Sequence, residues 1–155
     1  MERKTKVNAE NGKQEILITR EFDLPVDLLF RAFAEPEIVE QWMGTKVLKL
    51  ESFPGGRYQF ETSNPQGVVA IRMNGVYHEF VTDQRITRTF EMENTQFAVQ
   101  LEFLQFEALT EDTSRLNMHI IFKTGELRDQ LLKMPFAQGI NFAHNRLQEI
   151  VSNLK

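Results

Sequence analysis

The sequence predicts an α+β fold, in which a curved antiparallel sheet of about seven strands wraps around one long C-terminal helix. Three features of the chain predict it. A strand-like segment is followed by two short helical stretches, the middle of the chain is a series of alternating segments separated by turn residues, and the last stretch changes to the helical period. Consecutive strands joined by short loops form an antiparallel meander, and a helix with one apolar face covers such a sheet.

The first strand and the two short helices are expected at the start of the chain. Residues 15–22 form the strand, because apolar side chains recur at every second position. A helix begins after Pro25, since proline suits the first turn of a helix. Pro36 begins a second helix, which ends at Gly44, a residue that tolerates the left-handed conformation of a helix C-terminus.

Six further strands are expected in the middle of the chain, each bounded by turn residues, over residues 46–53, 57–62, 68–81, 85–93, 97–108 and 113–122. The alternation is clearest at the start of the fifth of these. Gln100 and Glu102 are expected in solvent there, and the opposite face is expected in the core, with Phe97, Val99, Leu101 and Phe103.

The dipeptide Asn74-Gly75 lies inside the long segment 68–81, although it is typical of a hairpin turn. Either the strand breaks there, or Gly75 marks a bulge or a close approach of two backbones. We prefer the second alternative, because the neighbouring strands are long enough to pair with an unbroken one.

The C-terminal stretch has the period of an amphipathic helix. After a short helical lead-in over residues 125–134, Pro135 begins a helix whose apolar residues recur at spacings of three and four. Gly139 lies inside this helix and costs about 1 kcal/mol relative to alanine. We therefore expect Gly139 to allow a close approach of the helix to the sheet.

Length and charge limit the class of protein. The chain has 155 residues, and we expect a flexible N-terminal arm over residues 1–13 and a single domain over residues 14–155. A net charge of −4 argues against a nucleic-acid-binding protein. Neither a secretory signal nor a membrane-inserting segment is apparent, so a cytoplasmic location is expected.

Phenylalanine dominates the aromatic residues. There are 13 Phe against two Tyr and one Trp, so the interior is expected to be rich in rings and poor in polar groups. Composition alone therefore predicts an apolar interior with few groups for catalysis.

The chemical motifs of common enzymes are missing from the sequence. The chain has no cysteine, no G-x-S-x-G motif and no histidine pair at metal-ligand spacing. We therefore expect no cofactor and no metal, and the sequence favours a protein that is not an enzyme without deciding the point. Among the histidines, His144 borders the apolar stripe of the last helix and can reach the interior.

One carboxylate is predicted to face the interior. Glu79 shares a strand face with Met73 and Tyr77, and Arg20 shares a face with the apolar residues of the first strand. A buried charge needs a partner, so we expect Glu79 to form an ion pair with a basic group such as Arg20. A role of Glu79 as a general acid or base is the alternative.

Short motifs follow one another in a fixed order, namely Arg20–Pro25, Val26–Phe33, Pro36-Glu37, Gln41–Gly44, Pro54–Gly56 and Gly75–Glu79. Over residues 14–154 this ordered set resembles the Hsp90-ATPase-activator-homologue-like family of the START/Bet v 1-like (helix-grip) superfamily. The chain departs from the family at two places. Trp42-Met43 replaces a frequent Trp-Trp pair and Gly139-Ile140 replaces a Gly-Trp pair, so a cavity here would have a different shape.

The resemblance implies a helix-grip fold with an apolar cavity between the sheet and the last helix. The function it implies is binding of a small apolar or aromatic molecule. Two alternatives stay open: a co-chaperone-like module that binds an Hsp90-type chaperone, and a cyclase or hydratase that uses Tyr77 and Glu79. A homodimer through an exposed strand edge is also left open. The residues expected to line the cavity are Trp42, Tyr58, Phe60, Met73, Tyr77, Glu79, Val99, Leu101, Phe103, Met118, Phe136, Ile140 and His144.

Overall fold

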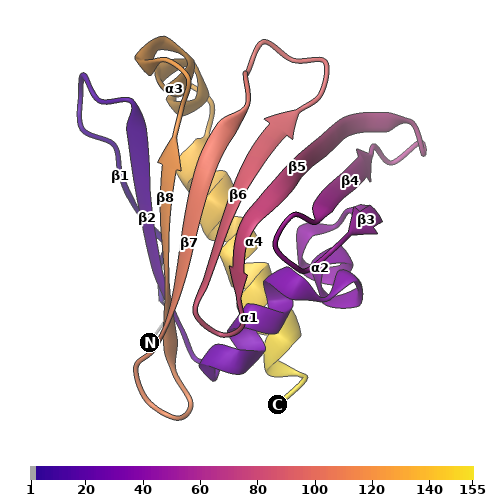
Figure 1. Ribbon diagram of the computed structural model, residues 1–155, viewed down its shortest axis with the longest axis vertical. Helices are drawn as coiled ribbons and strands as arrows, with labels where there is room; N and C mark the ends of the chain where they lie inside the picture. Colours follow the sequence, from indigo (N-terminus) through magenta and orange to yellow (C-terminus); the bar gives the residue numbers. More distant parts are fainter. Residues whose placement is uncertain (1–2) are drawn as a thin grey trace.

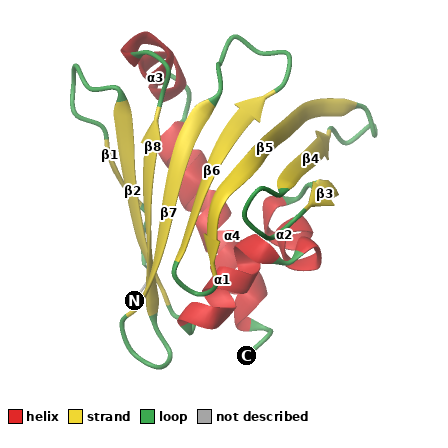
Figure 2. Ribbon diagram, in the orientation of Figure 1, coloured by secondary structure: helices red, strands yellow, loops and turns green. Residues whose placement is uncertain are grey.

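An eight-stranded antiparallel sheet forms one layer of the computed structural model, which describes residues 3–155. Helix α4 (Phe136–Ser152) runs along one face of this sheet, which we call the inner face (Figure 1). Helices α1 (Val26–Ala34) and α2 (Pro36–Met43) lie near one end of the sheet and α3 (Gly125–Leu132) near the other (Figure 2). The strands are β1 (Lys6–Asn8), β2 (Glu15–Phe22), β3 (Lys46–Leu50), β4 (Arg57–Ser63), β5 (Val69–Val81), β6 (Arg85–Met92), β7 (Gln100–Ala108) and β8 (Ser114–Ile121).

The strand order is β1-β2-β8-β7-β6-β5-β4-β3. From β3 to β8 each strand pairs with the next along the chain, as expected of a meander, and β2 then pairs with β8. The predicted α+β arrangement of a sheet on a long C-terminal helix is therefore confirmed.

The eighth strand comes from the N-terminal arm expected over residues 1–13, whose first two residues lie outside the described part of the chain. Strand β1 pairs antiparallel with β2. Just before it, the Thr5 N–H donates to Asn141 Oδ1 at 2.9 Å, and Thr5 Oγ1 lies 2.8 Å from His144 Nδ1. This segment therefore links the edge of the sheet to α4.

The two helices predicted after the first strand are confirmed. Pro25 occupies the position before α1, and Pro36 is the first residue of α2. Helix α2 ends at Gly44, whose φ of 64° lies in the left-handed region that glycine adopts readily.

Strand β5 is unbroken at Asn74-Gly75, and Gly75 marks a close backbone approach as preferred from the sequence. A Cβ built on Gly75 would lie 2.0 Å from the carbonyl oxygen of Thr89 and 2.5 Å from Tyr58 Oη. The irregularity of β5 lies elsewhere, because its pairing with β6 shifts register between Tyr77 and Glu79. Such a bulge changes which side chains after it face inward.

The orientation predicted for the start of β7 is wrong. Leu104 and Phe106 are buried on the inner face, and so is Glu102, whereas Leu101 and Phe103 point to the outer face of the sheet. Apolar residues occur at both parities of this strand, so alternation alone could not orient it. Glu102 is buried because it lies directly opposite Arg88 of β6.

The close approach expected at Gly139 is also wrong. This glycine is exposed on α4, and a Cβ added to it would meet no atom within 4 Å. It therefore lies on the side of the helix that faces away from the sheet.

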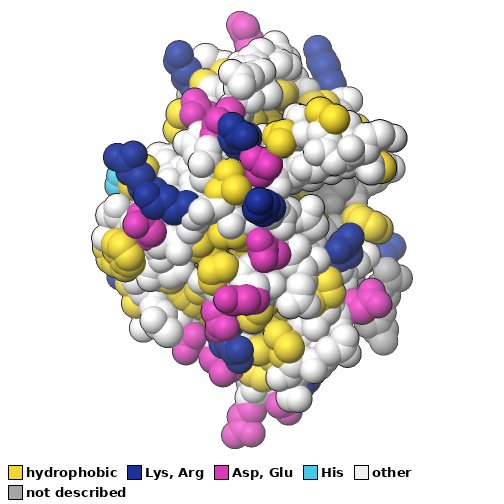
Figure 3. Space-filling view, turned by 90° about the vertical axis from the view of Figure 1, so that its right-hand side faces the viewer, with side chains coloured by type: hydrophobic (Ala, Val, Ile, Leu, Met, Phe, Trp, Pro, Cys, Tyr) yellow, Lys and Arg dark blue, Asp and Glu magenta, His cyan; other side chains and the backbone are white. Residues whose placement is uncertain are grey.

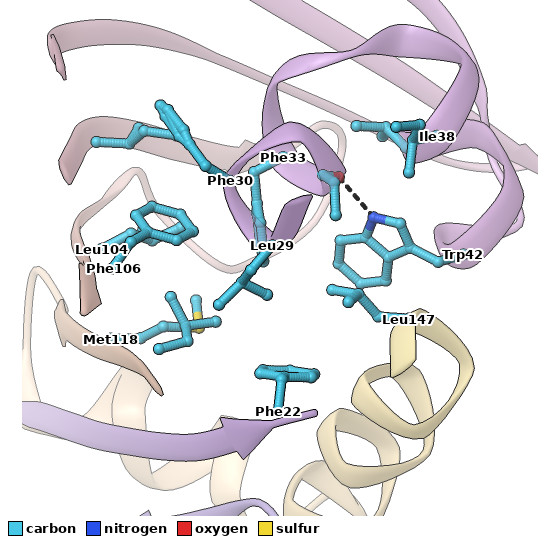
Figure 4. Packing of buried hydrophobic residues seen from close by; sticks show 14 of the residues in the cluster. Phe22, Leu29, Phe30, Phe33, Ile38, Trp42, Leu104, Phe106, Met118 and Leu147 are labelled. Atoms are coloured by element: carbon cyan, nitrogen blue, oxygen red, sulfur yellow. Dashed lines mark hydrogen bonds between the residues drawn. The ribbon is translucent and has the colours of Figure 1, made fainter. Parts of the chain in front are cut away.

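One apolar core joins helices α1 and α2 to the sheet and to α4 (Figure 4). Phe30 and Phe106 meet edge to face with ring centroids 5.0 Å apart, a favourable aromatic geometry. Trp42 is buried beside Phe33, and its Nε1–H donates to the Ala32 carbonyl at 2.7 Å. The indole is thereby fixed between the two short helices.

Charges of both signs are mixed on the surface, as the face in Figure 3 shows. Lysine and arginine do not gather there into a stripe. Within residues 3–155, no helix is long and apolar enough to cross a membrane.

Candidate functional site

A cavity of about 400 Å³ lies between the inner face of the sheet and the helices. Drug-sized ligands occupy pockets of about 300–1,000 Å³, so the volume suits one small molecule. The sheet contributes Ile18, Phe60, Phe90 and Ile120 to its wall, and the helices contribute Phe33, Val39, Trp42, Leu131, Phe136, Ile140 and Ala143.

Methionines are concentrated at this cavity. Every methionine within residues 3–155 lines it, namely Met43, Met73, Met92, Met118 and Met134. Methionine is flexible and polarizable, so it adapts its shape to different apolar partners. The wall is therefore apolar and can also adapt its shape to a bound molecule.

Three polar side chains on strands β6 and β7, Arg88, Gln100 and Glu102, also face the cavity, and we call them the polar set. Arg88 Nε donates to Glu102 Oε1 at 2.8 Å, and Gln100 Nε2 donates to Glu102 Oε2 at 2.8 Å. Both oxygens of the carboxylate are thus engaged, and its side chain is only 5% exposed.

The charge of Arg88 is stable in this site. Burial by itself disfavours the charged guanidinium, but the attraction and hydrogen bond of Glu102, together with Tyr58 and Tyr77, outweigh it, so the pKa of Arg88 is raised above its ordinary value. The guanidinium carbon also lies 5.5 Å from the centre of the Tyr58 ring, a cation–π contact. Arg88 and Glu102 therefore form a buried ion pair that is held by its surroundings.

Both tyrosines lie behind the polar set and do not line the cavity. Tyr58 Oη donates to the Thr89 carbonyl at 2.5 Å, and the rings of Tyr58 and Tyr77 are 5.1 Å apart. Burial raises the pKa of Tyr77 to about 12, although Arg88 nearby opposes the shift. Both phenols are therefore neutral at physiological pH.

His144 of α4 completes the polar part of the wall. His144 is only 1% exposed, and its ring meets that of Phe22 edge to face. Its Nδ1 forms a hydrogen bond with Thr5 Oγ1. Burial, together with the positive charge of Arg20, lowers the pKa of His144 to about 3. The imidazole is accordingly neutral and acts as a hydrogen-bonding group.

Most of the residues predicted to line the cavity are brought together there. Those on its wall are Trp42, Phe60, Met73, Met118, Phe136, Ile140 and His144. They come from five different elements that are far apart in the sequence, which is why the site forms only in the folded protein.

Six of the thirteen residues predicted to line the cavity are absent from its wall: Tyr58 and Tyr77, described above, Glu79, and three residues at the start of β7 or just before it. Val99, Leu101 and Phe103 are absent from the wall, because the start of β7 presents its other face to the cavity. Val99 is 47% exposed, and the Phe103 ring lies 5.8 Å from that of His119 on the outer face.

Glu79 does not face the cavity either. It pairs with a basic group as predicted, but this group is Arg85 and not Arg20. Glu79 accepts a hydrogen bond from Thr87 Oγ1 at 2.8 Å and pairs with Arg85 at 3.2 Å. The Thr87 bond, followed by Arg85, lowers the pKa of this exposed carboxyl. Arg20 is buried near α4, where Nη1 donates to Asn145 Oδ1 at 2.9 Å.

Sequence reasoning missed the polar set as a site. Arg88 shares a strand face with Ile86 and Phe90, which predicts that it faces inward, and a buried cation needs an anion near it. The neighbouring strand offers Glu102, so a search for the partner of Arg88 across the adjacent strand would have oriented β7 correctly.

Among the residues that the structure describes, no three histidine or carboxylate side chains are grouped so that they could hold a metal ion.

Comparison with protein families places most of the chain in one of them. The family model described as "Activator of Hsp90 ATPase homolog 1-like protein" matches residues 23–152. A search among curated proteins finds no match to this chain.

Solved structures share the fold. Protein Ms6760 from Mycobacterium smegmatis is 20% identical, with a TM-score of 0.81 over 94% of each chain. A protein from Rhodobacter sphaeroides is 17% identical, with a TM-score of 0.86 over 97% of this chain and 99% of its own. A protein from Arthrobacter aurescens is 17% identical, with a TM-score of 0.85 over 96% of this chain and 91% of its own. The helix-grip fold implied by the sequence motifs is confirmed.

Proposed function

Since this chain belongs to the Activator of Hsp90 ATPase homolog 1-like family, which has the helix-grip fold, we propose that it binds a small apolar or aromatic molecule in the cavity between the sheet and α4. The observation that carries the proposal is the apolar composition of the cavity wall. The wall is made almost entirely of methionine, phenylalanine and aliphatic side chains around a space of about 400 Å³. Transfer of apolar surface from water into such a space is favourable by about 25 cal/mol per Å².

Filling the cavity tests this function. Ala143 lines the cavity from α4, whereas Ala137 on the same helix is exposed and lies outside the wall. Ala143→Trp places an indole where the guest would lie, and Ala137→Trp is the matched control. We expect naphthalene, an uncharged aromatic probe, to bind the wild type and the control equally.

The filled variant should lose at least about tenfold in affinity, a difference of about 1.4 kcal/mol. Fluorescence titration measures the affinities, and circular dichroism checks that both variants are folded. Equal binding by Ala143→Trp and Ala137→Trp would place the probe outside the cavity and refute the proposal.

A second function is supported by the description of the matched family, which names activation of the Hsp90 ATPase. Under this proposal the chain binds an Hsp90-type chaperone through its surface. The test is the ATPase rate of a purified Hsp90-type chaperone with increasing amounts of this protein. A rate that stays flat, with no complex in analytical ultracentrifugation, would eliminate this role.

A catalytic role built on Glu79 has lost its basis. The carboxylate lies on the outer side with Arg85 and cannot reach a molecule in the cavity. We therefore do not propose a cyclase or hydratase.

A further inference from the structure

The polar groups of the cavity are not scattered over its wall. Arg88 and Glu102 lie directly opposite each other on adjacent strands, and Gln100 is two residues from Glu102 on the same strand. His144 is the one other titratable side chain of the wall within the described residues. A guest that fills the methionine-lined space therefore meets hydrogen-bonding groups at one defined place.

The polar set carries no net charge. Arg88 and Glu102 neutralise each other through a bond of 2.8 Å, and they are the two charged residues of the described wall. His144 is neutral, since burial keeps it unprotonated at physiological pH. Arg20 lies near His144 but is not part of the wall, and its guanidinium is bound to Asn145, Thr5 and the Glu21 carbonyl.

An anionic guest would find no free counter-charge in this cavity. A carboxylate drawn to Arg88 would come close to Glu102, and the repulsion between two carboxylates would offset the attraction. The guest would also lose its hydration on entry, which is costly for an ion without a dedicated partner.

A neutral hydrogen-bonding group fits the same place without this cost. A guanidinium has five N–H donors, and Glu102 takes the one on Nε, so the Nη groups can serve Tyr77 and a guest. Gln100 uses its amide N–H toward Glu102, and its amide oxygen remains an acceptor. The set thus offers both donors and an acceptor.

We propose that the natural guest is an uncharged amphiphile, an apolar or aromatic body with one neutral hydroxyl or amide group that binds at Arg88, Gln100 and Glu102. This inference rests on the proposed function, because it names the chemical class of molecule that the cavity takes. The cavity should therefore bind neutral alcohols, phenols and amides more tightly than fatty acids and aromatic acids.

Four compounds of nearly equal shape test the preference, namely naphthalene, 2-naphthol, 2-naphthamide and the 2-naphthoate anion. Their dissociation constants are measured with the full-length protein at pH 7 by fluorescence titration or calorimetry. We expect 2-naphthol and 2-naphthamide to bind about three- to tenfold more tightly than naphthalene, the gain of one net hydrogen bond. The naphthoate anion should bind at least about tenfold more weakly than 2-naphthol.

A charge change in the polar set should reverse the order of the affinities for 2-naphthol and 2-naphthoate. Glu102→Gln keeps the shape of the side chain but leaves the positive charge of Arg88 uncompensated. The affinity for 2-naphthoate should then rise at least about tenfold and exceed that for 2-naphthol. Glu61→Gln is the matched control, because Glu61 pairs with Arg72 across strands β4 and β5 outside the cavity wall.

A second variant covers the case in which Glu102→Gln fails to fold. Arg88→Met combined with Glu102→Leu removes both charges together, which buried ion pairs tolerate better than the loss of one partner. Gln100→Leu added to this double variant removes the third member of the polar set. The triple variant should bind naphthalene and 2-naphthol with affinities within about twofold of each other, because the hydrogen-bonding groups of the polar set are then gone.

The outcomes distinguish the two proposals. If the wild type binds all four compounds and the anion is as tight as 2-naphthol, the preference for a neutral guest is refuted and the cavity function stands. A triple variant that still prefers 2-naphthol to naphthalene refutes the docking position. If none of the four compounds binds the wild type, the inference falls together with the proposed function.

Discussion

The pair formed by Arg88 and Glu102 illustrates how a charge can be kept inside an apolar site. Removal of two ions from water costs several kcal/mol each, and their attraction repays this only when the geometry is good and the remaining polar atoms are satisfied. Here Gln100 satisfies the second oxygen of the carboxylate, and the Tyr58 ring covers the guanidinium. The ion pair is therefore stable only when both charges are present together with the contacts of Gln100 and Tyr58.

The stability of single and double variants should reflect this dependence. Glu102→Leu alone leaves Arg88 buried without its partner, so we expect the free energy of unfolding to fall by about 3–5 kcal/mol. The double variant Arg88→Met with Glu102→Leu should recover most of this loss. Urea denaturation measures both, and Glu79→Gln, at the exposed pair with Arg85, should leave stability nearly unchanged. A double variant as unstable as the single one would show that the loss does not come from the unpaired charge of Arg88.

His144 should make the protein sensitive to acid. Its pKa is lowered to about 3 in the folded state from about 6.5 in the unfolded chain, so between these values the unfolded state binds more protons. Stability then rises with pH from 3 to 6.5 and is lost as the pH falls through this window, with a limiting slope of about 1.4 kcal/mol per pH unit from this residue.

The check is a comparison of urea denaturation curves at pH 7.5, 5.5 and 4.5 for the wild type and His144→Leu. The variant should be less stable at pH 7.5, because it loses the hydrogen bond to Thr5, and it should lose less stability on acidification. Parallel pH profiles for the two proteins would rule out His144 as the cause.

At the scale of the elements, the sequence pattern predicts which face of some strands is buried, but it does not decide the orientation of others. Strand β2 was oriented correctly because its apolar residues other than Leu17 share one parity, with Ile16, Ile18 and Phe22 all buried. Strand β7 was not, since Leu101 and Leu104 have opposite parities and both are apolar. Its orientation depends on the pairing of Glu102 with another strand, which local alternation does not encode.

The same distinction holds for the candidate site. Residues of α4 such as Phe136, Ile140 and His144 followed from the helical period, because one stripe of a helix faces the sheet. Glu79 was misplaced because the bulge after Tyr77 moves it to the outer side. A bulge is set by pairing between strands, and the residues around it carry no local mark of it.

Two glycines of different elements should respond in opposite ways to alanine. In Gly75→Ala the added Cβ would collide with the Thr89 backbone, so we expect destabilisation of about 1–3 kcal/mol or more. In Gly139→Ala the Cβ meets open space in a helix, so we expect stabilisation of about 0.5–1 kcal/mol. Thermal and urea denaturation compare both with the wild type, and a shift of the same sign in the two variants would be inconsistent with the packing described here.

On the scale of the whole molecule, the cavity depends on elements from both ends of the chain. Ile18 lies on β2, which pairs with β8, and Ile140 lies on α4, which is held to the N-terminal segment by Thr5. A guest in this space contacts residues from nearly every part of the sheet. Its binding should therefore stabilise the molecule as one unit.

We expect 2-naphthol at a free concentration of 100 times its dissociation constant to raise the free energy of unfolding by about 2.7 kcal/mol. The gain should be absent in Ala143→Trp and present in Ala137→Trp. Hydrogen exchange should show slower exchange in β2, β8 and α4 together when the compound is bound. Protection confined to one end of the sheet would indicate binding at a surface site instead.

The order of the elements along the chain also has a consequence for synthesis. The first long strand of the sheet finds its partner, β8, only after about a hundred further residues have been made, with Arg20 opposite Leu116. The helix of 17 residues that covers the inner face is made later than all the strands. Until the ribosome has completed α4, the methionines and phenylalanines of the sheet lack the cover of this helix, so the nascent chain exposes an apolar face that can associate with other chains.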